Sequence, residues 1–125
     1  MNKINKKILV VEDEQAYQRA LVDKLAIHGY EVFGANNGEE GLEKAFSMHP
    51  DLILVDVQMP KMDGIEMAKK IREDQWGKNV HIIVLTNFSD MDKLQQAMEN
   101  NIFQFIIKTD IKIEDLLAKV EEALS

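Results

Sequence analysis

The sequence predicts an α/β domain in which five β-strands alternate with five α-helices around one parallel sheet. Short apolar runs such as Ile8–Val11 and Leu52–Val55 have the length and composition of strands buried on both faces. Segments with apolar residues at helical spacing lie between the runs, most clearly from Ile113 to Leu124. Such alternation in one short chain implies right-handed crossovers and a parallel sheet covered by helices on both faces.

Two common ways exist to wind such a sheet. For five strands, the flavodoxin-like order 2-1-3-4-5 is favoured, with its switch point between strands 1 and 3. The second strand has less apolar content than the others, which is typical of a sheet edge. This order brings the carboxyl ends of strands 1 and 3 together where open α/β sheets bind ligands. The expected strands are Ile8–Val11, Tyr30–Ala35, Leu52–Val55, Val80–Leu85 and Ile102–Ile107.

Capping residues place the helices between these strands. Gly29 suits the end of the first helix, and Asn37 with Glu40 resembles a capping box for the second, which Pro50 ends. The third helix follows Gly64 and stops by Gly77, and the fourth begins near Ser89, with Asp92 three residues on. The residues expected on the apolar faces are Tyr17, Leu21, Leu25 and His28; Leu42, Ala45, Phe46 and His49; Ile65, Ala68 and Ile71; Met91, Leu94 and Met98; and Ile113, Leu116, Leu117, Val120 and Leu124.

Composition limits the classes of function. The 125 residues suffice for a single core, so we expect one domain over residues 1–125. With 15 basic and 22 acidic side chains the net charge is -7, which argues against direct binding to nucleic acid or an anionic membrane. Cysteine is absent, which excludes disulfides and thiolate metal sites and fits the cytoplasm. No segment approaches the roughly 20 apolar residues of a membrane-spanning helix.

Acidic residues follow two of the expected strands. Glu12 and Asp13 come after the first strand, and Asp56 ends the third. In one crevice, two unit charges about 4 Å apart cost about 4 kcal/mol at an effective dielectric constant of about 20. A hard divalent cation relieves this repulsion, and Mg²⁺ suits one or two carboxylates with waters and a phosphate. The alternative is that Asp13 only caps the first helix and Glu12 is solvated.

Three further residues belong to strands that end at the same edge. Thr86 ends the fourth strand with a hydroxyl, Lys108 ends the fifth with a mobile cation, and Phe105 lies three residues before Lys108. Taken singly, each has a simpler explanation: β-propensity for Thr86, a solvated loop cation for Lys108 and core packing for Phe105. Together with the acids they suit phosphoryl transfer to a carboxylate, in which Mg²⁺ and Lys108 offset charge while Asp56 attacks.

Four motifs occur in a specific order: VEDE at 11–14, DLILVDVQMPKMDG at 51–64, VLT at 84–86 and FIIK at 105–108. Through them the entire chain resembles the CheY-like receiver domain of two-component response regulators. The resemblance implies that Asp56 accepts a phosphoryl group from a histidine kinase or histidine phosphotransfer protein. It also implies that Lys108 contacts the phosphoryl group. The implied ligands of Mg²⁺ (or Mn²⁺) are Glu12, Asp13, Asp56 and the main-chain carbonyl of Gln58.

The resemblance further implies a conformational switch. Thr86 would move toward the phosphate and Phe105 would turn inward behind it. The face made by the fourth helix, the fifth strand and the fifth helix would then change its preference for a downstream protein effector or a second copy. Such a module regulates other proteins and is not an enzyme acting on an external substrate.

The chain departs from the family pattern at several positions. Glu12 stands where aspartate is commoner, and Asn87 stands where a small residue is usual. Thr109 replaces a proline that follows a cis bond; because a cis bond before another residue costs about 2.5–4 kcal/mol, we expect trans here. Phe88 and Phe103 replace polar residues, and either add packing or form a hydrophobic docking surface.

Two other functions compete with this interpretation. Haloacid-dehalogenase-like phosphohydrolases also use a strand-end aspartate, but they carry a second aspartate two residues later, where this chain has Gln58. A pseudo-receiver would keep the fold without being switched by phosphate. The acids, Thr86 and Lys108 argue against a pseudo-receiver, whereas Asn87 and Thr109 keep that alternative open.

Overall fold

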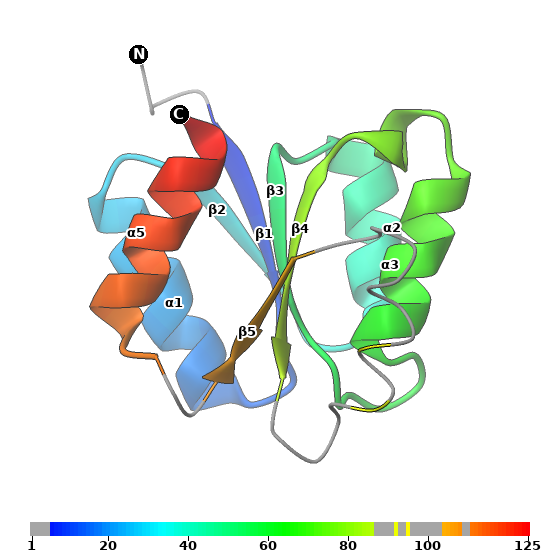
Figure 1. The fold of residues 1–125 in the computed structure, drawn as a ribbon, viewed down its shortest axis with the longest axis horizontal. Helices are drawn as coiled ribbons and strands as arrows, with labels where there is room; N and C mark the ends of the chain where they lie inside the picture. Colours follow the sequence, from blue (N-terminus) through cyan, green and yellow to red (C-terminus); the bar gives the residue numbers. More distant parts are fainter. Residues whose placement is uncertain (1–5, 87–91, 93–94, 96–103, 109–110) are drawn as a thin grey trace.

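Five parallel strands form one sheet in the computed structural model, which describes residues 6–86, 92, 95, 104–108 and 111–125. The strand order is β2-β1-β3-β4-β5, so the predicted order is confirmed (Figure 1). The second strand lies at a sheet edge, as its lower apolar content predicts. The strands are β1 (Lys7–Val11), β2 (Glu31–Ala35), β3 (Leu52–Asp56), β4 (His81–Thr86) and β5 (Gln104–Ile107).

Helices cover both faces of the sheet. Helices α1 (Gln15–Ile27) and α5 (Ile113–Leu124) lie on one face, and α2 (Gly38–Met48) and α3 (Gly64–Glu73) lie on the other (Figure 1). A short 3₁₀ helix, η2 (Trp76–Lys78), follows α3. No helix of the described residues is both long and apolar enough to cross a membrane.

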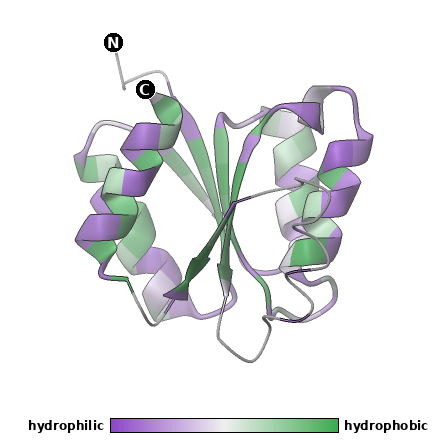
Figure 2. Cartoon of the chain, viewed as in Figure 1, coloured by the Kyte–Doolittle hydropathy of each residue, from purple (hydrophilic) through white to green (hydrophobic). Residues whose placement is uncertain are grey.

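The core has two layers because successive side chains of a strand point to opposite faces. Along β1, Ile8 and Val10 pack in the cluster beneath α1 and α5, whereas Leu9 and Val11 pack in the cluster beneath α2 and α3. The sheet is correspondingly apolar along its length, with polar residues on the outer helix surfaces (Figure 2). All five residues of β3 are buried, as expected for a central strand covered on both sides.

Capping residues begin and end the helices largely as the sequence predicts. Asn37 caps α2 by accepting a hydrogen bond from the Glu40 N–H at 2.8 Å, and the Glu40 carboxylate accepts one from the Asn36 N–H at 2.8 Å. Gly29 follows α1 with a φ of 98°, which glycine adopts without steric cost. Asp63, which the sequence analysis did not single out, caps α3 through the Glu66 N–H.

Three residues expected on buried helix faces lie elsewhere. His28 is exposed just beyond the end of α1. Phe46 is 39% exposed and packs edge-on against Trp76, with ring centroids 6.1 Å apart. The His49 ring stacks on the same indole at 4.5 Å. The predictions for Phe46 and His49 are wrong because both rings pack on Trp76, while Ala45 is the α2 residue that is fully buried in the core. The prediction for His28 is wrong because α1 ends at Ile27.

Several predictions fall outside the described residues. The fourth helix, with Ser89, Met91, Leu94 and Met98, is described only at Asp92 and Gln95, both of which are helical. The first two residues of the expected fifth strand lie outside as well, and so do Asn87, Phe88, Phe103 and Thr109.

Candidate functional site

The predicted site residues meet at the carboxyl edge of the sheet. Glu12 and Asp13 directly follow β1, and Asp56 is the last residue of β3. Thr86 is the last residue of β4, and Lys108 directly follows β5. Because all five strands are parallel, their carboxyl ends share one edge, and residues up to 96 positions apart in sequence come into contact there.

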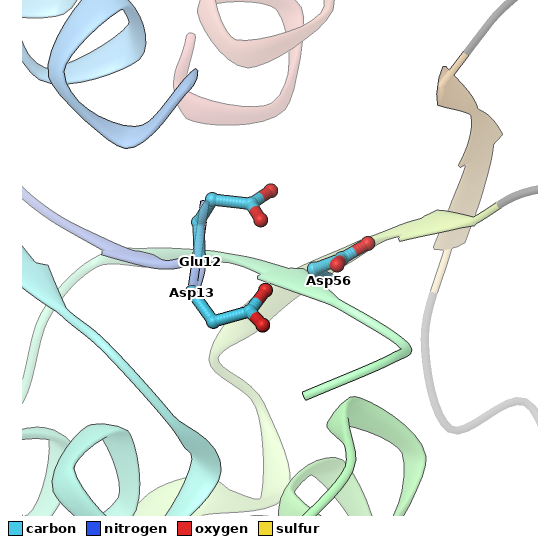
Figure 3. A group of neighbouring side chains, drawn as sticks. All are labelled: Glu12, Asp13 and Asp56. Atoms are coloured by element: carbon cyan, nitrogen blue, oxygen red, sulfur yellow. The ribbon is translucent and has the colours of Figure 1, made fainter. Parts of the chain in front are cut away.

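Three carboxylates form the centre of this site. One oxygen from each of Glu12, Asp13 and Asp56 lies within 4.8 Å of the other two. Figure 3 shows Glu12 and Asp13 extending from the end of β1 toward the side where Asp56 lies. Glu12 is only 1% exposed and Asp56 7% exposed, whereas Asp13 faces solvent. The three negative charges therefore repel each other in a partly dehydrated environment.

Backbone contacts fix the residue that follows Asp56. The Val57 N–H donates to the Leu85 carbonyl at 3.0 Å, and the Gly64 N–H donates to the Val57 carbonyl at 3.0 Å. Gly64 lies so close to the Asp56 carbonyl oxygen that an added Cβ would collide with it. Glycine at this position therefore lets α3 begin directly against the end of β3.

Gln18 fixes the corner between β1 and α1. Its side-chain amide donates to the Glu12 carbonyl at 2.7 Å and to the Ala35 carbonyl at 3.0 Å. The Glu12 N–H donates to the same Ala35 carbonyl at 3.0 Å. These contacts tie the backbone of the acidic pair to the neighbouring strand.

Lys108 lies among the acids but is closest to Glu12. Its Nζ is 2.8 Å from Glu12 Oε1, 3.7 Å from Glu14 Oε1 and 3.9 Å from Asp56 Oδ1. The ammonium also lies over the Tyr17 ring, 4.3 Å from its centroid. With 15% of its side chain exposed, Lys108 is a partly buried cation whose main partner is Glu12.

Burial dominates the electrostatics of the carboxylates. It raises the pKa of Asp56 to about 7, helped by the charges of Glu12 and Asp13 and opposed by Lys108 and the Val57 N–H. Burial also raises the pKa of Glu12, although hydrogen bonds from Lys108 and the Glu14 N–H oppose it. Asp56 is thus easily protonated near neutral pH, and a cation that joins the site favours its ionised form.

The Lys108 ammonium stays charged. Burial alone would lower its pKa, but Glu12, Asp56 and Glu14 together raise it. The pKa of its partner Glu12 is raised too, because burial outweighs the hydrogen bond from Lys108. The 2.8 Å contact between Nζ and Oε1 is typical of a charge-assisted hydrogen bond between an ammonium and a carboxylate.

The donor set fits a hard divalent cation. Its carboxylate oxygens are ligands that Mg²⁺ accepts. Glu12 already uses Oε1 for Lys108 and Oε2 for the Glu14 N–H at 3.1 Å. Asp13 and Asp56 are therefore the carboxylates best able to contact a cation directly. Gln58 lies two residues beyond Asp56 in the loop that leads to α3, with its side chain exposed.

Thr86 and Phe105 occupy the same face of neighbouring strands. Thr86 is fully buried and lies on the same face of β4 as Ile82 and Val84, which belong to the core beneath α2 and α3. Phe105 packs against this core and pairs in register with Val84. The two predicted switch residues are thus diagonal neighbours across β4 and β5.

Two residues near Lys108 were missed by the sequence analysis. Tyr17 was expected only on the apolar face of the first helix, and Glu14 was given no role. Both contact Lys108, at 4.3 Å and 3.7 Å. Their positions offered a signal, because Glu14 directly follows the acidic pair and Tyr17 lies in the first turn of the helix that comes next.

Known proteins are similar to this chain in sequence. A family model for the response regulator receiver domain matches residues 8–121. Regulatory protein AtoC of Escherichia coli is 33% identical over 124 residues, which cover 99% of this chain and 26% of AtoC. Transcriptional regulatory protein PdtaR of Mycobacterium tuberculosis is 34% identical, over 98% of this chain and 58% of PdtaR. The chain thus spans only part of the length of these relatives.

Solved structures agree with the sequence relatives. Chemotaxis protein CheY4 of Vibrio cholerae has a TM-score of 0.85 and 30% identity, covering 95% of this chain and 98% of CheY4. Response regulator TrrA of Thermotoga maritima, solved in complex with Mg²⁺ and BeF, has a TM-score of 0.80 and 34% identity, covering 94% and 98%. The chain therefore belongs to the response regulator receiver domain family of two-component signalling.

Proposed function

We propose that residues 1–125 form one receiver domain in which Asp56 is the phosphoacceptor. The donor is a phosphohistidine on a histidine kinase or a histidine phosphotransfer protein. The observation that carries this proposal is the convergence of Glu12, Asp13 and Asp56 within 4.8 Å, with the Lys108 ammonium 3.9 Å from Asp56. Asp56 is the member of this group that lies at the end of the central strand β3.

The transfer exchanges one bond to phosphorus for another. A carboxylate oxygen of Asp56 attacks the phosphorus, the new O–P bond forms as the N–P bond breaks, and the electron pair returns to the partner's imidazole nitrogen. Lys108 lies close enough to Asp56 to bind an oxygen of the transferred group. Water later breaks the acyl phosphate, which regenerates the Asp56 carboxylate and releases inorganic phosphate.

Mg²⁺ (or Mn²⁺) is the proposed cofactor. When bound, it offsets the negative charge of the acids and of the phosphoryl oxygens. Asp13, Asp56 and the main-chain carbonyl of Gln58 are the proposed direct ligands. Glu12, whose two oxygens accept from Lys108 and the Glu14 N–H, contributes through water or after releasing Lys108.

Phosphorylation is proposed to switch the face made by helix 4, β5 and α5. Thr86 would move toward the phosphoryl group, and Phe105 would turn into the space behind it. Their diagonal placement across β4 and β5 supports this coupling. The changed face would bind a downstream protein effector or a second copy of the domain.

The proposed role is regulatory and cytoplasmic. Gln58 lacks the second acid that a haloacid-dehalogenase-like hydrolase carries two residues after its nucleophile, which argues against turnover of an external phosphate ester. The net charge of -7 argues against direct contact with nucleic acid or an anionic membrane.

Binding of a phosphoryl mimic tests this function. The protein is titrated with Mg²⁺ and beryllofluoride while amide resonances are followed by NMR. We expect shifts centred on Asp56, Asp13 and Lys108 that spread to β5 and α5, and no such shifts in Asp56→Asn. Beryllofluoride binding without any change in β5 or α5 would contradict the switch. An absence of binding would favour a pseudo-receiver.

A further inference from the structure

The Lys108 ammonium has two kinds of neighbour, carboxylates and an aromatic ring. Among the residues that the structure describes, three carboxylates lie within 4.0 Å of its Nζ, and that of Glu12 at 2.8 Å is closest. Another neighbour is the face of the Tyr17 ring, whose centroid is 4.3 Å from Nζ. A cation within about 6 Å of an aromatic centroid is attracted by the electron density of the ring. Tyr17 is therefore an electrostatic partner of Lys108 as well as a packing residue.

Glu12 has two competing uses. It is the closest partner of Lys108, and it is also one of the three acids that converge at the cation site. Asp56 has the same double use at a longer distance. A divalent cation bound by these acids would thus weaken the hold on Lys108 at the stage when its ammonium must face the phosphoryl group.

Tyr17 and Glu14 lie outside this competition. Neither belongs to the convergent acidic group. Tyr17 is anchored on α1, half-buried against the core beneath α1 and α5, so its ring is held in place by packing. Glu14, 3.7 Å from Nζ and largely exposed, adds a weaker and more mobile contact. The ring is the partner of Lys108 that remains fixed when the acids bind a cation.

We infer that Tyr17 is a positioning residue for Lys108, whose ring face keeps the ammonium over the acidic site while a divalent cation engages the carboxylates. This inference rests on the proposed phosphoacceptor function. The ring supplies the interaction and the hydroxyl is not needed. Phenylalanine should therefore replace tyrosine, whereas leucine, which fills similar space without an aromatic face, should not.

The contact itself can be tested without cation or phosphodonor. Protons near the face of an aromatic ring resonate upfield, so the Lys108 ε-methylene signals of the metal-free protein should stand apart from those of the other lysines. In Tyr17→Leu they should return to the common position, and in Tyr17→Phe they should move upfield again. An unshifted Lys108 signal in the wild type would overturn the inference, whatever the phosphorylation result.

The consequence for phosphorylation is tested with acetyl phosphate at saturating Mg²⁺. An exposed or half-buried cation–π contact changes an equilibrium by about two- to fivefold, so Tyr17→Leu should slow Asp56 phosphorylation by about that factor. Tyr17→Phe should restore the rate. Melting temperatures of both variants are measured in parallel. A Tyr17→Leu protein that melts lower but reacts at the wild-type rate would show that Tyr17 only packs.

The outcomes separate this inference from the proposed function. If the wild-type protein is not phosphorylated, the proposed function fails, and the methylene signals still decide whether Tyr17 holds Lys108. If the wild type is phosphorylated and both variants match its rate and its Lys108 signals, the function stands and the role of Tyr17 is refuted.

Discussion

Replacing Asp56 with asparagine measures what it costs to ionise this carboxyl in the folded protein. Burial, followed by the charge of Glu12, raises the Asp56 pKa from 3.8 to about 7. The folded state therefore binds this proton more tightly than the unfolded chain does. Stability is unaffected below pH 3.8, falls as the pH rises toward about 7, and stays reduced above that value. Asparagine, which stays neutral, avoids the loss.

The two pKa values set the size of the effect. The pKa of Asp56 rises by about 3, from 3.8 to about 7, and each pKa unit corresponds to about 1.36 kcal/mol. The upper limit on the stability lost by ionising Asp56 is therefore about 4 kcal/mol. Lys108 Nζ lies 3.9 Å away and can turn toward Asp56 as the carboxyl ionises. We therefore expect Asp56→Asn to raise the free energy of unfolding by about 2 kcal/mol at about pH 8.

Urea denaturation without divalent cations, at about pH 8 and about pH 4.5, measures this difference. The gain should shrink at the lower pH, where the wild-type carboxyl is protonated in the folded state. Asp23→Asn, an exposed position on α1, provides the matched control and should change little. Added Mg²⁺ should stabilise the wild type more than Asp56→Asn.

A particular result would refute this reasoning. If Asp56→Asn raises the free energy of unfolding no more than Asp23→Asn does at about pH 8, the folded protein does not hold Asp56 in a buried acidic cluster. A gain of equal size at both pH values would show that the asparagine acts through some other contact. Either result would remove the electrostatic basis for the cation site.

Two further substitutions test other contacts of the site. Lys108→Met leaves the buried Glu12 carboxylate without its 2.8 Å partner, so we expect a loss of about 2 kcal/mol at neutral pH and a smaller loss at about pH 4, where Glu12 is protonated. Lys44→Met, which removes the more exposed 3.2 Å pair with Glu40 together with a 2.6 Å hydrogen bond to the Gly34 carbonyl, should cost less than Lys108→Met in the same urea assay. Gly64→Ala places a methyl group against the Asp56 carbonyl oxygen, and we expect a cost above about 1 kcal/mol with weaker Mg²⁺ binding. A cost below about 1 kcal/mol, or unchanged Mg²⁺ binding, would contradict the importance of the Gly64 contact.

Strand-end positions are the part of the site that sequence reasoning predicts well. Hydrophobic runs place Glu12, Asp13 and Asp56 at the ends of strands, and a parallel sheet brings those ends together. The order β2-β1-β3-β4-β5 then requires β1 and β3 to be neighbours. Little freedom remains for the backbone, so a pattern of residue types is enough to predict that the carboxylates converge.

The sequence pattern does not predict which of several possible partners a flexible side chain contacts. Lys108 has Glu12, Glu14, Asp56 and the Tyr17 ring within reach, and its preference for Glu12 depends on distances that periodicity does not encode. The ambiguity is physical, because several anions at similar distances compete for one flexible ammonium.

The aromatic residues of α2 show a second limit. Helical spacing predicts that Phe46 faces the core, but it lies against Trp76 instead. Trp76 comes from a 3₁₀ helix far along the chain, so no local pattern around Phe46 reveals its partner. Contacts between distant surface segments therefore need the structure.

The most direct test of the account is the site of phosphorylation itself. The protein is incubated with Mg²⁺ and acetyl phosphate, and the intact mass and the modified peptide are measured, with a parallel reaction in excess chelator. We predict the addition of one phosphoryl group on Asp56 that depends on Mg²⁺ and is absent from Asp56→Asn. A phosphoryl group on another residue, or no modification of the folded wild-type protein, would contradict the assignment of Asp56 as the phosphoacceptor.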